Sequence, residues 1–157
     1  CGTFQADFNL PDRLDAEYIG EDGSKHQHVM MHRAILGSFE RFIGILIENY
    51  SGKLPLWLAP TQLSILTVTE EVNDYALSLK EKFDAINLRV ELDNRNEKIG
   101  YKIREHSNAK VPLMAVIGKE EMSANTVSIR NLRKNETNTY SIDEVLELLE
   151  VNSSSPK

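Results

Sequence analysis

The sequence lacks the features that mark several specialised classes of protein. It has one cysteine, Cys1, in 157 residues, which excludes an internal disulfide framework and is typical of a reducing compartment. Its longest apolar run, residues 42–47, is far shorter than the roughly 18 residues that a membrane span needs. Lys and Arg number 18 against 24 Asp and Glu, so the net charge of −6 does not suggest nucleic acid. We therefore expect a folded cytoplasmic protein with no membrane partner.

The N-terminus also lacks a targeting signal. The chain starts at Cys1-Gly2-Thr3, with no Met, no basic segment and no apolar secretory segment. Because this start falls inside an alternating pattern, we expect the sequence to be a piece of a longer chain.

The first third of the sequence has the periodicity of strands followed by one helix. Residues 1–8 alternate polar and apolar side chains, and residues 28–36 form a second apolar run, so both are expected to be strands. Residues 9–13 are expected to be a proline-containing connection. Asp22-Gly23 predicts a hairpin-like turn. Ser38 is a plausible N-cap for an amphipathic helix that ends near Tyr50.

The pattern changes after residues 53–60, which contain two prolines and the only tryptophan. Strands are expected at residues 62–68, 88–92, 113–117 and 126–131, and helices at residues 69–87, 99–107 and 141–149. This alternation predicts an α/β domain with parallel strand pairs. Ser141 and Glu144 have the spacing of a capping box. Residues 132–139 are expected to be a polar loop and residues 151–157 a flexible tail.

Positive charge is concentrated in one segment. Residues 95–134 contain nine Lys or Arg and four Glu, which leaves a local excess of five positive charges. This excess fits either a nucleic-acid footprint or an ordinary solvated face. From spacing alone, Arg41 fits either a surface ion pair or a group that stacks on a base, and the four histidines have no metal-ligand spacing.

Several sequence blocks resemble one enzyme family. The blocks are CGTFQADFNLPDRLDAEYIGEDG, VMMHRAILGSFERFIGILIENY, LPLWLAP and DNRNEKIGYKIREHSNAKVP, and they are similar to the C-terminal part of bacterial-type threonyl-tRNA synthetases. The segment from Ala34 to Phe42 looks like motif 3 of class II aminoacyl-tRNA synthetases. The resemblance implies that residues 1–55 are the end of an antiparallel catalytic domain. Residues 56–150 would be an anticodon-binding domain with a mixed, largely parallel five-stranded sheet flanked by helices.

The resemblance also implies roles for individual residues. The family activates threonine with ATP and Mg²⁺ and ligates it to tRNA(Thr), usually as a homodimer, so tRNA(Thr), ATP and threonine are the expected partners. Arg41 matches the motif 3 arginine that stacks on adenine and contacts phosphate, and Thr3, Gln5 and Ser38 match positions around the adenylate. His32 matches one ligand of a Zn²⁺ ion whose other ligands belong to sequence outside this chain. Positions that meet the anticodon are matched by Asn96, Lys98, Arg104, Glu121 and Arg130.

Two other functions compete with this interpretation. An accessory RNA- or DNA-binding protein could reuse the anticodon-binding fold without catalysis, although such a protein has no need for Thr3, Gln5, His32 and Arg41. A flavodoxin-like regulatory domain is a more distant alternative, but the segment after the strand at 62–68 has no glycine-rich phosphate loop. We expect this chain alone to bind RNA and to be inactive as a ligase.

Overall fold

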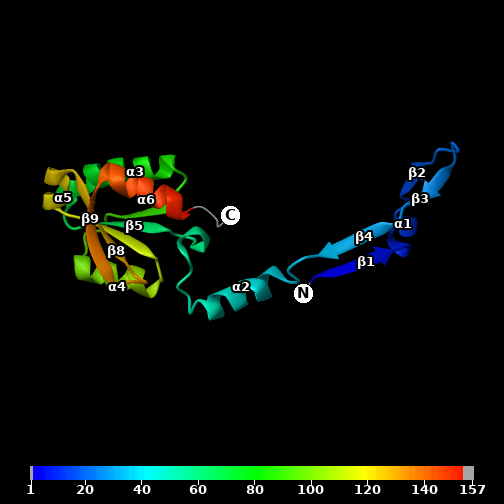
Figure 1. The fold of residues 1–157 in the computed structure, drawn as a ribbon, viewed down its shortest axis with the longest axis horizontal. Helices are drawn as coiled ribbons and strands as arrows, with labels where there is room; N and C mark the ends of the chain where they lie inside the picture. The colour runs from blue at the N-terminus through cyan, green and yellow to red at the C-terminus, as the bar shows by residue number, and fades with distance from the viewer. Residues whose placement is uncertain (1, 154–157) are drawn as a thin grey trace. The chain divides into compact units, whose positions relative to one another are not determined.

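The computed structural model describes residues 2–153 and divides into two compact units between Glu48 and Asn49 (Figure 1). The sequence pattern placed the boundary slightly later, between residues 55 and 56. None of the described helices is long and apolar enough to cross a membrane.

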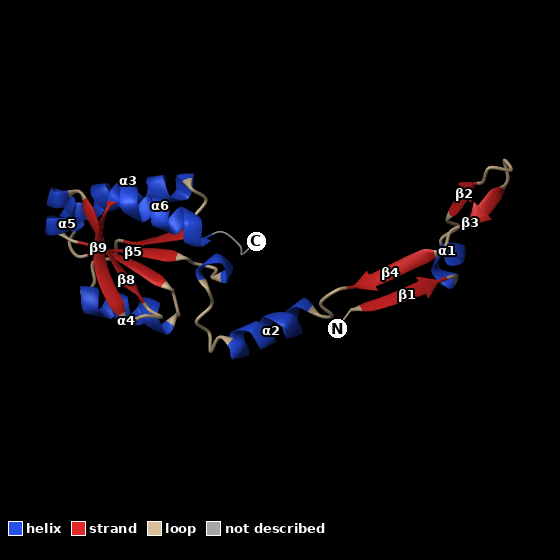
Figure 2. Cartoon of the chain, viewed as in Figure 1, coloured by secondary structure: helices blue, strands red, loops and turns tan. Residues whose placement is uncertain are grey.

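The first unit contains two antiparallel strand pairs and two helices (Figure 2). Strand β1 (Thr3–Asp7) pairs with β4 (Met30–Ala34), and β2 (Glu17–Ile19) pairs with β3 (Lys25–Gln27). The expected strands, hairpin and motif 3 helix, α2 (Phe39–Asn49), are all present. Most apolar side chains of this unit are exposed.

One expectation for this unit is wrong. Residues 9–13 form a short helix, α1 (Asn9–Arg13), instead of an irregular connection. The Asp7 carboxylate accepts the backbone N–H groups of Asn9 (2.9 Å) and Leu10 (3.0 Å), which satisfies donors that a helix start leaves free. Pro11 lies in the first turn, where a missing N–H costs nothing.

The second unit is a five-stranded sheet with helices on both faces. The strands have the order β6-β5-β7-β8-β9, with β5 parallel to β6 and β7, and β8 antiparallel to β7 and β9. The sheet is therefore mixed, as expected, with equal numbers of parallel and antiparallel pairs. A flavodoxin-like domain has the same strand order with all strands parallel, so the reversed direction of β8 excludes that alternative. The elements are η1 (Leu56–Leu58), β5 (Leu63–Thr67), η2 (Glu70–Val72), α3 (Asn73–Ala85), β6 (Val90–Asp93), α4 (Ile99–Asn108), β7 (Leu113–Ile117), α5 (Lys119–Ala124), β8 (Thr126–Asn131), β9 (Glu136–Ser141) and α6 (Ile142–Ser153).

The hydrophobic core lies on one face of this sheet. Helices α3 and α6 cover that face and α4 lies on the other side (Figure 1). Leu79 and Phe83 of α3 and Val145 and Leu149 of α6 are fully buried against inward-facing strand residues such as Ile65. We call this face the core face.

The second unit differs from the sequence expectations at three further places. The expected loop at 132–139 ends in strand β9, whose Thr137 and Thr139 pair with Arg130 and Ser128 of β8, and the connecting turn is made by Asn135 at a φ of 55°. The unexpected helix α5 follows Gly118. Helix α6 continues through Ser153, so residues 151–153 are helical, and the rest of the expected tail lies outside the described residues.

Within the second unit, the segment that precedes β5 is fixed to the sheet. The Arg89 guanidinium donates to the carbonyl oxygens of Trp57 (2.8 Å) and Ala59 (2.9 Å). The Gln62 amide donates to the Leu56 carbonyl (2.9 Å) and accepts the Arg89 N–H. These bonds satisfy the backbone of a proline-containing segment that cannot pair as a strand.

Candidate functional site

The face of the sheet opposite the core carries Arg130, one of the predicted anticodon residues. Paired residues on neighbouring strands lie on the same face, so the register defines rows across the sheet. One row places Ser64, Met114, Arg130 and Thr137 side by side. Because His106 of α4 contacts Ser64, this is the face that α4 covers, and we call it the α4 face.

Helix α4 covers only part of the α4 face. It packs on β5, and its residues Lys102 and His106 are buried there. On the side of β8 and β9, the same face presents Ser128 and Arg130, which are half-buried, and Thr137 and Thr139, which are exposed. The β8–β9 part of the α4 face is therefore a polar surface open to a ligand.

A buried ionic network joins α4 to the edge at which β5, β6 and β7 end, which we call the carboxyl edge. Lys102 Nζ donates to the carbonyl oxygens of Thr67 (2.9 Å) and Asp93 (3.1 Å), the last residues of β5 and β6. His106 Nε2 lies 3.0 Å from Asp93 Oδ2, and its Nδ1 lies 3.1 Å from Ser64 Oγ. Only 1% of the Lys102 side chain and 4% of that of Asp93 are exposed.

The network also closes the loop that follows β6. Arg95 donates to both Asp93 carboxylate oxygens (2.9 and 2.7 Å) and to Glu105 (2.8 Å). These bonds from Arg95, together with the bond from His106, outweigh burial and hold the pKa of Asp93 well below its usual range. Burial lowers the pKa of Lys102, and the negative charge of Asp93 partly opposes this shift. Sequence reasoning missed this network, because an i, i+4 pair such as Lys102 and His106 usually marks an exposed helix face.

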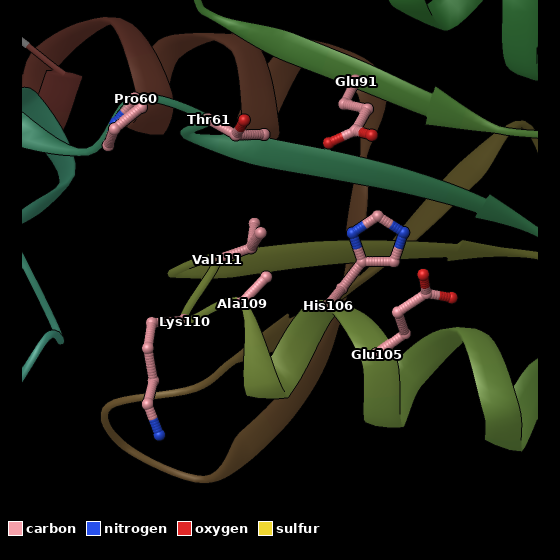
Figure 3. A pocket seen from close by; sticks show the side chains of 8 residues that line it. All are labelled: Pro60, Thr61, Glu91, Glu105, His106, Ala109, Lys110 and Val111. Atoms are coloured by element: carbon pink, nitrogen blue, oxygen red, sulfur yellow. The ribbon is translucent and has the colours of Figure 1, made fainter.

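The contacts of His106 resemble a catalytic serine–histidine–aspartate relay in their order. However, Ser64 is completely buried, and the Asp93 carboxylate is bonded to Arg95. Figure 3 shows the small pocket beside this group, in which the His106 ring lies between Glu91 and Glu105. No substrate carbonyl can reach a fully buried hydroxyl, so the relay is structural.

The predicted anticodon residues Asn96, Lys98 and Arg104 lie beside this network. Asn96 and Lys98 follow β6 at the carboxyl edge, where the sequence placed them, and Arg104 lies on α4. All three are exposed, and their side chains form no hydrogen bond or ion pair with other residues in the range 2–153. Three other cations of the basic segment form ion pairs within the chain: Arg95, Lys102 and Lys119. Their charges are therefore less available to a ligand than those of Lys98 and Arg104.

Glu121 has a structural role that its sequence pattern did not reveal. Its Oε2 accepts the N–H of Gly118 (2.9 Å) at the start of α5, and its Oε1 accepts the hydroxyl of Ser128 (2.8 Å) on β8. A Cβ at position 118 would lie 3.1 Å from Oε2, so glycine gives the carboxylate room. Partial burial raises the pKa of Glu121, but the bonds from Ser128 and Gly118 outweigh it, so the pKa lies below the usual value and the group stays ionised.

Arg130 and Glu121 form no ion pair with each other among the described residues. Within the described chain, the Arg130 guanidinium has one side-chain partner, Asn135 Oδ1, at 3.5 Å. Glu121 bonds to Ser128, which is two residues before Arg130 on the same face of β8. A carboxylate has about four acceptor positions, so the bonds from Gly118 and Ser128 leave acceptor capacity on Glu121. The structure thus places on one open face a guanidinium that makes one long hydrogen bond and a carboxylate that is bonded to Gly118 and Ser128.

In the first unit, the strand pairing brings three predicted residues together. Thr3 and Gln5 lie on one face of β1, and Gln5 is paired directly with His32 of β4. His32 Nε2 lies 3.2 Å from Asp7 Oδ2. Among residues 2–153, no three His, Cys, Asp or Glu side chains converge on one point. A zinc site takes three or four protein ligands, so the described residues do not complete one by themselves.

Ser38 and Arg41 lie at the start of α2. The Ser38 hydroxyl donates to Glu40 (2.6 Å) and accepts the backbone N–H of Arg41 (3.3 Å), as expected of an N-cap. The Arg41 side chain is exposed and has no hydrogen-bond or ion-pair partner in the described part of the chain. Its guanidinium is therefore free for a ligand.

Two family models match the sequence. The model described as anticodon binding domain matches residues 62–152, which are the sheet and helices of the second unit. The model described as tRNA synthetase class II core domain (G, H, P, S and T) matches residues 1–50, which include β1, β4 and α2.

Individual relatives agree with these matches. The chain is 59% identical over 149 residues to the threonine–tRNA ligase of Ehrlichia canis (strain Jake), which covers 95% of this chain and 24% of the relative. It is 54% identical over 156 residues to that of Caulobacter vibrioides (strain NA1000 / CB15N), with 99% and 24% covered. A crystal structure of the RNA binding domain of threonyl-tRNA synthetase from Cryptosporidium parvum Iowa II has a TM-score of 0.75 at 32% identity, covering 100% of this chain and 40% of that one. The chain thus spans about a quarter of the length of the curated relatives it matches.

The buried network predicts a large loss of stability when its carboxylate is removed. We expect Asp93→Asn to lower the free energy of unfolding of the second unit by about 3–5 kcal/mol, because Lys102 and Arg95 lose their counter-charge. Glu91→Gln, an exposed acid on the same strand, should change it by less than about 0.5 kcal/mol. Urea unfolding checks both, and an Asp93→Asn loss no larger than that of Glu91→Gln would contradict the role of the network.

The same network predicts how stability depends on pH. The pKa of Asp93 is lower in the folded than in the unfolded chain, so its contribution is present above the unfolded value of about 3.9 and is lost as pH falls below it. We expect the wild-type chain to lose more stability than Asp93→Asn between neutral pH and about pH 3. Parallel pH profiles for the two proteins would contradict this assignment.

Proposed function

The chain belongs to the anticodon-binding domain family, and we propose that it reads the anticodon of a threonine tRNA as the C-terminal part of a threonine–tRNA ligase. The observation that carries the proposal is the open part of the α4 face, where Arg130 and Glu121 lie near one another with ligand-binding capacity left. The choice of threonine as the amino acid rests on the names of the relatives, which are threonine–tRNA ligases.

The chemistry of the open face suits the bases concerned. Threonine codons are ACN, so each matching anticodon has guanine in the middle and uracil at its third position. An unstacked guanine presents N–H donors on its Watson–Crick edge and the acceptors O6 and N7 elsewhere, which suit a carboxylate and a guanidinium respectively. In this proposal Glu121 accepts from the guanine and Arg130 donates to it. Asn96, Lys98 and Arg104 contact the neighbouring base edges and phosphates.

The first unit supports the proposal that the parent protein is the complete ligase. We propose that Arg41 stacks on the adenine of ATP and contacts its phosphates, with Thr3, Gln5 and Ser38 around the adenylate. His32 would be one ligand of a Zn²⁺ ion that binds threonine, with the remaining ligands supplied by residues other than those described. Mg²⁺ would accompany ATP, and the parent would be a cytoplasmic homodimer.

One observation favours this proposal over an accessory binding protein. An accessory subunit has no use for a free motif 3 arginine or for a histidine and a glutamine paired across two strands. These features lie in the segment that matches the class II core model. A chain that bound RNA only would retain the second unit alone.

The proposed recognition of guanine predicts that substitutions on the open face weaken RNA binding in a base-specific way. We expect Arg130→Ala to weaken binding of a threonine-tRNA anticodon stem-loop by about 1–3 kcal/mol and to reduce discrimination at the middle base. Glu121→Gln should behave in the same way, while its amide oxygen still accepts the Gly118 N–H and keeps the start of α5 intact. Binding of stem-loops with each of the four middle bases checks both variants.

A phosphate contact should have a different signature. Lys98→Ala should weaken binding equally for every middle base and reduce the salt dependence of binding, because fewer counterions are released. Lys82→Ala serves as the control, since Lys82 is an exposed cation on α3, which covers the core face. The assignment fails if the Arg130 and Glu121 variants discriminate against a wrong middle base as well as the wild type does.

The proposed zinc ligand predicts that this chain alone does not hold the metal. A single imidazole beside one carboxylate supplies too few ligands, so after dialysis we expect far less than one zinc per chain. Metal analysis of the wild type and of His32→Ala checks this. If the wild type retains one zinc per chain and His32→Ala does not, the zinc site is complete within this sequence.

The proposed nucleotide contact predicts that charge alone cannot replace Arg41. In the complete ligase, Arg41→Lys should slow threonine activation by roughly 10²-fold or more, because an ammonium group neither stacks flat on adenine nor presents a fork of donors. Pyrophosphate exchange measures this step. Activation close to the wild-type rate would place Arg41 away from the nucleotide.

A further inference from the structure

One exposed aromatic side chain in the second unit has no structural explanation. Within residues 49–153, Tyr101 on α4 is the single aromatic residue that is exposed, at 54%, whereas the others, such as Phe83 and Tyr140, are buried or half-buried. Its hydroxyl forms no hydrogen bond with the described residues. A single exposed side chain is ordinary by itself, so the surroundings of Tyr101 decide its meaning.

The backbone beneath Tyr101 is held rigidly. Its N–H donates to the carbonyl of Lys98 (2.8 Å), and the next residue, Lys102, is anchored by its ammonium group to the ends of β5 and β6. Because consecutive helix residues point about 100° apart, the anchoring of Lys102 toward the sheet directs Tyr101 away from it. The backbone that carries the ring is thus fixed beside the carboxyl edge, and only the side chain remains to be ordered by a ligand.

Two unpaired cations flank the ring. Arg104 is three residues after Tyr101, which is the spacing of neighbours on one side of a helix, and Lys98 is the N-cap of the same helix. Neither side chain has an internal partner among the described residues, in contrast to Arg95 and Lys102 nearby. A ring between free cations suits a base with a phosphate on either side better than it suits an apolar protein surface.

From these contacts we propose that Tyr101 is a stacking platform for an unpaired base of the anticodon loop, with Lys98 and Arg104 on the phosphates beside that base. This inference rests on the proposed function and adds to it a contact that reads no base edge. Stacking on an aromatic side chain tolerates every base, since each has a π-face. Tyr101 would hold the loop in place while Arg130 and Glu121 read the guanine.

The test uses the full chain and synthetic threonine-tRNA anticodon stem-loops in which 2-aminopurine replaces one loop base at a time. Stacking quenches 2-aminopurine fluorescence. We expect one loop position to be quenched on binding to the wild type and to Tyr101→Phe but not to Tyr101→Ala. The affinity of Tyr101→Ala should fall about tenfold or more, a loss typical of one stacked base. Alanine is the best helix former, so α4 should remain folded.

Two controls separate stacking from other roles. Leu77→Ala removes a similarly exposed apolar side chain from α3 and should leave affinity unchanged. The salt dependence of binding should be the same for Tyr101→Ala and the wild type, because an uncharged ring releases no counterions, whereas Lys98→Ala should reduce it.

The outcomes distinguish this inference from the function on which it rests. If the wild type does not prefer the threonine stem-loop to one with a scrambled anticodon, the proposed function fails. If the wild type shows that preference and Tyr101→Ala binds with the same affinity and the same quenching, the stacking inference is overturned and the proposed function stands.

Discussion

The arrangement of the second unit depends on two opposite charges that are buried together. Lys102 binds the last carbonyl groups of β5 and β6, and the Asp93 carboxylate balances its charge while also holding His106 and Arg95. Removing either partner would leave an uncompensated buried charge, which costs far more than an exposed ion pair contributes. This constraint fixes the first turn of α4 against the carboxyl edge. It therefore also fixes the loop that carries Lys98.

The two faces of the sheet are covered differently, and the difference creates the site. The core face is covered by α3 and α6, which bury most of its apolar residues. The α4 face has one helix on β5, and its β8–β9 part carries hydroxyl groups and the Arg130 guanidinium instead of a hydrophobic layer. A polar sheet surface without a covering helix costs nothing in water and is available to a polar ligand. RNA bases splayed out of a loop are such a ligand.

Much of the fold could be predicted from the sequence, but the network beneath the site could not. The apolar pattern located β5 and β7, which are buried almost throughout, and β8 and α3, which each bury one face. It also located α4, although the residues that α4 buries are Lys102 and His106. It failed at β9, where alternating Thr and Asn face solvent, and at α5, which has no buried residue to reveal its period. A pattern of charges does not show which of them are buried, so Lys102 looked like part of a basic surface. The second role of Glu121, which joins the start of α5 to β8, was hidden because no local pattern shows its bond to Ser128.

The central claim is that RNA binds the carboxyl edge and the β8–β9 part of the α4 face. The most direct measurement is a backbone-amide NMR titration of the chain with a threonine-tRNA anticodon stem-loop. The account predicts shifts concentrated at residues 96–104, 118–121, 128–130 and 137–139, with α3 and α6 little changed. Shifts centred on α3 and α6, or spread evenly over the exposed cations of both faces, would contradict it.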